Sequence, residues 1–194
     1  MILYLHGFRS SPQSSKARLI AARLQALGRN KEYHCPQLPA SPQAAMTLAF
    51  DLARRFSPEE VTLIGSSLGG YYATWLAEQI GCRAVLLNPA IKPLRDLEQY
   101  VGITTAYHSG QAFEFKREYI AELQALEVSR ITQPERYFLI AATGDEVLDW
   151  REMVAHYPAA MQHVIDGSDH GLSDFGSYLE EVLTFCGNAS TARH

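Results

Sequence analysis

The stretch Leu63–Gly70, "LIGSSLGG", places two serines among three glycines directly after the apolar run "VTLIG". A short apolar run of this kind predicts a buried strand, and the residues from Leu68 onward predict a helix. In a parallel sheet, sites lie beyond the carboxyl ends of the strands, where this turn falls. The glycines therefore indicate a turn too tight for side chains, at a place where a site can form.

The spacing of the glycines selects one of the two serines. Gly65, Ser67 and Gly69 fit G-x-S-x-G, the nucleophile elbow, in which Ser66 is only the x position. Glycine-rich turns also join strands to helices in nucleotide-binding units, but a phosphate loop places a lysine after its glycines and the dinucleotide fingerprint is G-x-G-x-x-G. This chain has neither, so the pattern favours an exposed Ser67, and we expect Gly70 to let the new helix pack closely on the sheet.

The rest of the chain alternates strands with helices. Helices are predicted near 16–28, over 42–56 with Ser41 as the N-cap, over 68–80 before Gly81, and from Ser173 or Asp174 onward. The strands are apolar throughout, which is typical of a parallel sheet covered on both faces. The predicted fold class is therefore α/β, with strands near 1–5, 61–65, 83–89, 137–144 and 161–167.

One segment is too long for an ordinary crossover. Residues 92–134 include "FEFKREYIAELQALEV", which looks helical, and we expect them to form a cap-like insertion over the strand ends. Residues 1–187 are predicted to form a single domain that contains this insertion. Residues 188–194 are expected to be a flexible tail, because they have nothing apolar to bury.

Composition excludes several classes of partner. The net charge is −4, hydrophobic residues make up 47% and charged residues 20%, and no basic block is present, which argues against nucleic acid or an anionic membrane. No apolar run approaches the roughly 18 residues of a membrane span, and no signal peptide is recognisable. Cys35, Cys82 and Cys186 lack metal-ligand spacing and are interpreted as reduced thiols of a cytoplasmic protein. The sequence does not indicate an oligomeric state.

A nucleophilic serine needs a histidine base held by a carboxylate, and the elbow fold sets the order serine, acid, histidine. Of the histidines after Ser67, only His170 lies in a loop between a predicted strand and the last helix, at another carboxyl end. The others lie in a strand pattern, a short helix, the insertion or the tail: His163, His156, His108 and His194. His170 is therefore the candidate base.

The acid is expected after the preceding strand. Asp145 follows "YFLIAATG" directly and is the first choice, while Asp149 is the alternative and could instead cap a helix starting near Trp150. Glu146 is expected to point to solvent.

The oxyanion of an acyl-transfer intermediate needs backbone donors. The N–H of Leu68 follows the nucleophile, and the N–H of Phe8 in "LHGF" is the candidate for the second donor. His6 precedes Ser67 in the chain, so it is interpreted as a brace for this oxyanion loop.

These residues together give a resemblance. "LYLHGFRSSPQSSKA", "PQLP", "LIGSSLGGYYATWLAE", "LNPAIKP", "TGDEVLDWREMVAHY" and "IDGSDHGLSDF" are similar to the α/β-hydrolase superfamily and to its small bacterial YqiA-type esterases. The resemblance implies a reduced α/β-hydrolase fold and a compact cytosolic serine esterase. It implies Ser67, Asp145 and His170 as catalytic residues, and Phe8 with Leu68 as oxyanion donors.

The expected activity is hydrolysis of a small carboxylic ester with a short acyl chain, through an acyl-enzyme and without a metal or organic cofactor. Two alternatives stay open at this point. The same residues could serve an acyl-thioesterase, and the scaffold could carry a non-catalytic binding protein.

Overall fold

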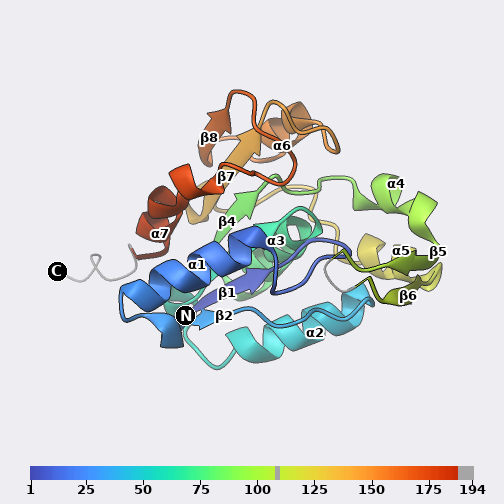
Figure 1. The fold of residues 1–194 in the computed structure, drawn as a ribbon, viewed down its shortest axis with the longest axis horizontal. Helices are drawn as coiled ribbons and strands as arrows, with labels where there is room; N and C mark the ends of the chain where they lie inside the picture. The colour runs from blue at the N-terminus through green and yellow to red at the C-terminus, as the bar shows by residue number, and fades with distance from the viewer. Residues whose placement is uncertain (108–109, 188–194) are drawn as a thin grey trace.

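The computed structural model describes residues 1–107 and 110–187. Its centre is a six-stranded sheet in the order β2-β1-β3-β4-β7-β8, with every neighbouring pair parallel (Figure 1). This confirms the predicted α/β class. The strands are β1 (Ile2–Leu5), β2 (Tyr33–His34), β3 (Thr62–Ser66), β4 (Arg83–Leu87), β7 (Tyr137–Ala142) and β8 (Met161–Ile165).

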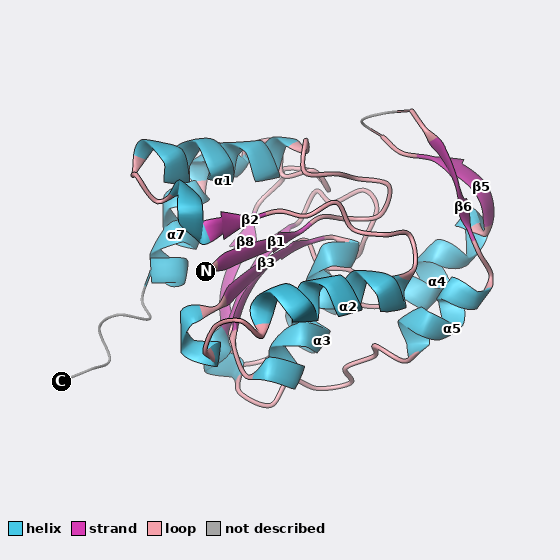
Figure 2. Cartoon of the chain, turned by 90° about the horizontal axis from the view of Figure 1, so that it is seen from below, coloured by secondary structure: helices cyan, strands magenta, loops and turns pink. Residues whose placement is uncertain are grey.

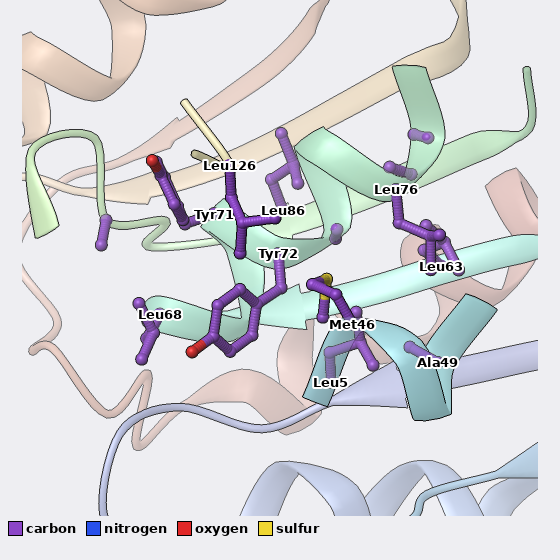
Figure 3. Close-up of a cluster of buried hydrophobic side chains, with 14 of the residues drawn as sticks. Leu5, Met46, Ala49, Leu63, Leu68, Tyr71, Tyr72, Leu76, Leu86 and Leu126 are labelled. Carbon is purple, nitrogen blue, oxygen red and sulfur yellow. The ribbon is translucent and has the colours of Figure 1, made fainter. Parts of the chain in front are cut away.

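Helices cover both faces of the sheet (Figure 2). On one face lie α1 (Ser15–Ala26) and α7 (Leu179–Gly187), and on the other lie α2 (Pro42–Ala53), α3 (Leu68–Ile80) and α6 (Trp150–His156). Successive strand residues point to opposite faces, so Leu63 and Ile64 enter different buried clusters. Figure 3 shows one cluster, where α3 packs against α2 and the sheet.

Several predicted helix ends are confirmed. Ser41 caps α2 by accepting a hydrogen bond from the Ala44 N–H at 3.1 Å. Gly81 ends α3 in the left-handed region, with φ 78°. The last helix begins later than predicted, because residues 175–177 form the 3₁₀ turn η5 and α7 starts only at Leu179.

The long segment after β4 is not mainly helical. It forms α4 (Pro93–Leu97), the 3₁₀ turn η3 (Glu98–Tyr100), strands β5 (Gly102–Thr105) and β6 (Ala112–Phe115), and α5 (Glu118–Gln124). The helix predicted from Phe113 onward therefore starts at Glu118, since residues 112–115 pair antiparallel with 102–105 instead. Figure 2 shows this hairpin beside α4 and α5, away from the main sheet.

The hairpin contacts the loop that follows β1. The Arg9 guanidinium donates to the Thr105 carbonyl and, at 3.0 Å, to the Thr105 hydroxyl. The Tyr107 N–H donates to the Arg9 carbonyl at 2.8 Å, and the Arg9 guanidinium stacks over the Tyr107 ring. The oxyanion loop predicted from sequence is therefore tied to β5 and the residues after it.

Short 3₁₀ turns η1 (Asn30–Glu32), η2 (Pro58–Glu60) and η4 (Pro134–Arg136) precede strands β2, β3 and β7. All three cysteines are free, and Cys82 and Cys186 are buried. Within residues 1–107 and 110–187, no helix is both long and apolar enough to cross a membrane. The tail predicted for residues 188–194 lies outside the described residues.

Candidate active site

Ser67 occupies the turn between β3 and α3, with φ 54° and ψ −121°. Residues other than glycine rarely adopt a positive φ, so surrounding contacts must hold this conformation. The Ser67 N–H donates to the Leu87 carbonyl at 3.0 Å, and its carbonyl accepts from the Ala90 N–H at 3.0 Å. These bonds fix the strained turn to the end of β4.

The two elbow glycines are needed for space. A Cβ on Gly65 would lie 2.2 Å from the Gly69 carbonyl oxygen, and a Cβ on Gly69 would lie 1.9 Å from the Leu5 carbonyl oxygen. Both distances are far below contact, so any larger residue would push α3 away from β1 and β3. A Cβ on Gly70 would lie 2.6 Å from the Pro89 Cβ in the loop after β4 and 3.5 Å from the Gly65 carbonyl oxygen of β3, so Gly70 too lets α3 pack closely.

The three predicted catalytic residues lie in three loops at the carboxyl ends of the strands: Ser67, His170 and Asp145. The His170 Nε2 lies 3.0 Å from the Ser67 Oγ, and its Nδ1 lies 2.8 Å from the Asp145 Oδ2. The other oxygen, Oδ1, accepts hydrogen bonds from the N–H groups of Val147 and Leu148, each at 2.8 Å. The Asp145 side chain is fully buried and His170 is partly exposed, so the cleft is lined by Ser67 and His170 but not by Asp145.

The alternative acid has another partner. The Asp149 carboxylate accepts from the Arg151 N–H at 2.9 Å and caps α6, as the sequence allowed. Glu146 is exposed as expected, but it is not free, because its Oε2 accepts from the His170 backbone N–H at 3.0 Å. We missed this contact, which steadies the histidine loop.

Two further described histidines follow Ser67 in the chain, and neither lines the cleft that contains Ser67. His163 lies in β8 and contacts Glu181 at 2.8 Å, and His156 lies in α6, where burial lowers its pKa below the usual value. His108 and His194 lie outside the described residues.

The two predicted oxyanion donors border the same cleft as Ser67. Leu68 is the first residue of α3, and Phe8 follows β1 in the loop facing it. Neither backbone N–H donates a hydrogen bond to another residue of the described chain. Both groups are therefore available to a ligand oxygen.

His6 lies next to this loop. Its Nε2 accepts from the Leu38 N–H at 3.0 Å, and its Nδ1 lies 3.0 Å from the Gly7 carbonyl oxygen. The imidazole thus joins the oxyanion loop to the loop after β2, the bracing position expected for it.

Sequence reasoning missed Asn88, which directly follows β4 and is fully buried with φ 42°. Its Oδ1 accepts from the Ala142 N–H at 2.8 Å, at the end of β7. Its Nδ2 donates to the carbonyls of Asp169 at 3.0 Å and His170 at 3.2 Å. The Asn88 amide therefore joins the end of β7, which precedes Asp145, to the loop that contains His170. The sequence signal for this role is weak: Asn88 precedes Pro89 at the end of a predicted strand.

We expect Asn88→Ala to lower the free energy of unfolding by about 1–3 kcal/mol, because it leaves buried backbone groups without partners. It should also lower kcat, since the histidine loop loses an anchor. Urea unfolding and ester hydrolysis measure the two effects. Asn30→Ala, in an exposed 3₁₀ turn, is the control and should change stability by no more than about 0.5 kcal/mol. Equal behaviour of the two variants would contradict this role.

The cleft in front of Ser67 has a volume of about 420 Å³. One part of its wall is apolar and comes from Leu68, Leu97, Tyr100 and Leu148, and another part is polar and comes from the start of α1. A second cavity of about 540 Å³ shares Phe8 and Leu68 with this cleft and is also lined by Phe113, but Ser67 does not line it.

Comparison with known proteins supports this fold. Residues 1–187 match the family described as "Uncharacterised protein family (UPF0227)". Among solved structures, a monoacylglycerol lipase from Paleococcus ferrophilus is similar with a TM-score of 0.72 at 13% identity, covering 97% of this chain and 94% of that one. Est1E from Butyrivibrio proteoclasticus has a TM-score of 0.67 at 16% identity, covering 95% and 87%.

A third similar structure is the mouse α/β hydrolase domain-containing protein 10, with a TM-score of 0.67 at 15% identity, covering 94% of this chain and 89% of that one. At such identities the likeness concerns the fold. The parallel sheet and the turn after β3 agree with the fold of these similar structures. The chain has the fold of the α/β hydrolases and belongs to the UPF0227 family.

Proposed function

We propose that this protein is a serine hydrolase that cleaves carboxylic esters with short acyl groups, through an acyl-enzyme. The observation that carries the proposal is the unbroken series of contacts from Ser67 Oγ through His170 to the buried Asp145. A hydroxyl is a weak nucleophile, and an adjacent base oriented by a third group is what activates it.

In this mechanism His170 takes the proton from Ser67 as the Ser67 oxygen attacks the ester carbonyl. Asp145 keeps the proton on Nδ1, so that Nε2 can accept, and it stabilises the imidazolium that forms. The N–H groups of Leu68 and Phe8 receive the developing oxyanion. His170 then protonates the leaving alcohol, and a water molecule repeats the sequence to release the acid.

Labelling with a fluorophosphonate tests the nucleophile directly. We expect one covalent adduct, located on Ser67 by peptide mass spectrometry, and hydrolysis of short-chain esters by the unlabelled protein. Comparing oxygen and thiol esters of the same acyl group decides between esterase and thioesterase. If the probe does not react with the protein, and the protein hydrolyses neither oxygen esters nor thiol esters, a non-catalytic binding protein would be the better description.

The apolar wall of the cleft predicts an acyl limit of about two to six carbons, on the scale of ordinary ligand cavities. Tyr100 lines this wall and packs on the Phe8 ring at 5.4 Å between centroids. Tyr100→Ala should raise the preferred acyl length by about two carbons, because the lost ring leaves room for methylene groups. A profile of kcat/KM against chain length measures it.

Tyr119→Ala is the matched control. Tyr119 packs on Phe115 but does not line the cleft, so its loss should leave the preferred length unchanged. A wild-type protein that already prefers long acyl groups would contradict the predicted limit.

A further inference from the structure

Lys16 is a buried cation at the active site. It is the second residue of α1, only 7% of its surface is exposed, and its ammonium donates to the carbonyl of Gly171, the residue after His170. Lysine is almost never this buried without a partner of opposite charge. Its position therefore needs a physical reason.

The nearby carboxylates have other partners. Asp145 is held by His170 and two backbone N–H groups, and Asp169 Oδ1 accepts from the Ser173 N–H at 2.9 Å. Both favour the charged ammonium from a distance, yet burial outweighs them and lowers the pKa of Lys16 to about 8. Within the described residues, no carboxylate forms a salt bridge with Lys16.

An ammonium has three N–H donors, and the Gly171 carbonyl accepts from one of them. Lys16 also lines the cleft that contains Ser67 and His170, next to Ser14 and Ser15. The cleft wall has one other charged side chain, Asp96 from α4, whose Oδ1 is paired with Arg95 at 2.7 Å and whose Oδ2 is buried without a hydrogen-bond partner in the described part of the chain. The part of the wall formed by the start of α1 is thus positive, and the Lys16 ammonium there has donors to spare.

We propose that the substrate of this site is an ester that also carries a carboxylate, and that Lys16 binds this carboxylate. The inference rests on the hydrolase proposed above and names its substrate class. A single ammonium suits a singly charged carboxylate, because charge-assisted hydrogen bonds gain most where water is excluded. A phosphate would need more donors than one lysine supplies.

The competing explanation is structural. Through Gly171, Lys16 joins α1 to the histidine loop, and that bond alone could account for its burial. A clamp of this kind would affect every substrate alike, whereas a binding group would discriminate by charge. The two roles therefore predict different ratios of the rate with a charged substrate to the rate with a neutral one.

The experiment compares esters that differ only by carboxylate and carboxamide. Monoethyl succinate against ethyl succinamate tests a carboxylate on the acyl side, and para-carboxyphenyl butyrate against para-carbamoylphenyl butyrate tests the alcohol side. We expect the wild-type kcat/KM to favour the carboxylate in at least one pair by about tenfold, as for a charge-assisted contact. Lys16→Met should remove that preference, and Lys16→Arg should keep part of it.

Lys31→Met is the control for net charge, because Lys31 is exposed in η1 and does not line the cleft. It should keep the wild-type ratio. Thermal unfolding checks that each variant folds. If Lys16→Met does not fold, the ratio of kcat/KM values within each substrate pair still tests the proposal in the wild-type protein. Equal rates within both wild-type pairs, or an equal loss on both members in Lys16→Met, would overturn the inference while fluorophosphonate still labels Ser67. Absence of Ser67 labelling would instead overturn the hydrolase itself.

Discussion

Ser67→Ala is expected to lower kcat for ester hydrolysis by about 10³-fold or more, as for loss of a triad nucleophile. The Ser67 hydroxyl is the atom that His170 Nε2 faces at 3.0 Å, and its removal leaves no group to form the acyl-enzyme. The fold should persist, because the turn is held by backbone bonds of Ser67 to Leu87 and Ala90. Steady-state kinetics and circular dichroism measure the two properties.

Ser66→Ala is the control for this variant. Ser66 ends β3 and also lines the cleft, but the His170 Nε2 contacts the Ser67 Oγ and not Ser66. We expect this variant to retain most of its activity. An inactive Ser66→Ala beside an active Ser67→Ala would show that the elbow has been assigned to the wrong serine.

Asp145→Asn is expected to lower kcat by about 10²- to 10⁴-fold, because an amide favours the wrong tautomer of the histidine. The Asp145 carboxylate contacts His170 Nδ1 at 2.8 Å and is fully buried, so water does not substitute for it. The substitution keeps one oxygen for the Val147 and Leu148 N–H groups, and the loop should therefore stay folded. Kinetics with one short-chain ester measure the loss.

Asp149→Asn is the matched variant, four residues along the same loop. Its side chain caps α6 instead of contacting the histidine, and asparagine caps helices about as well as aspartate. Only a small change in rate is expected. A larger loss here than in Asp145→Asn would move the acid to Asp149.

The fold and the three central residues could be predicted because their signals are local. The central strands β1, β3, β4 and β7 are mainly apolar runs, and a parallel sheet brings the carboxyl ends of all its strands to one side. A residue that directly follows such a run is therefore placed by the topology. Ser67, Asp145 and His170 each follow one of the strands β3, β7 and β8.

Asn88 and Lys16 could not be found in this way. Asn88 contacts a backbone N–H 54 residues away, and Lys16 reaches a carbonyl 155 residues away. Nothing in the neighbouring sequence marks a side chain whose role depends on such distant backbone. The hairpin was missed for a related reason, because residues 112–115 have a helical-looking context and become a strand only by pairing with residues 102–105.

The bonds of Arg9 to the hairpin matter for anyone who wishes to exchange that hairpin between relatives. Arg9 stands directly after Phe8, and its partners are Thr105 and the backbone of Tyr107. A chimera that replaces the whole hairpin would leave the oxyanion loop without these partners, and poor turnover would then be mistaken for a mismatched acyl pocket. Variants that keep residues 102–107 and change only Tyr100 of η3 would separate substrate preference from loop placement.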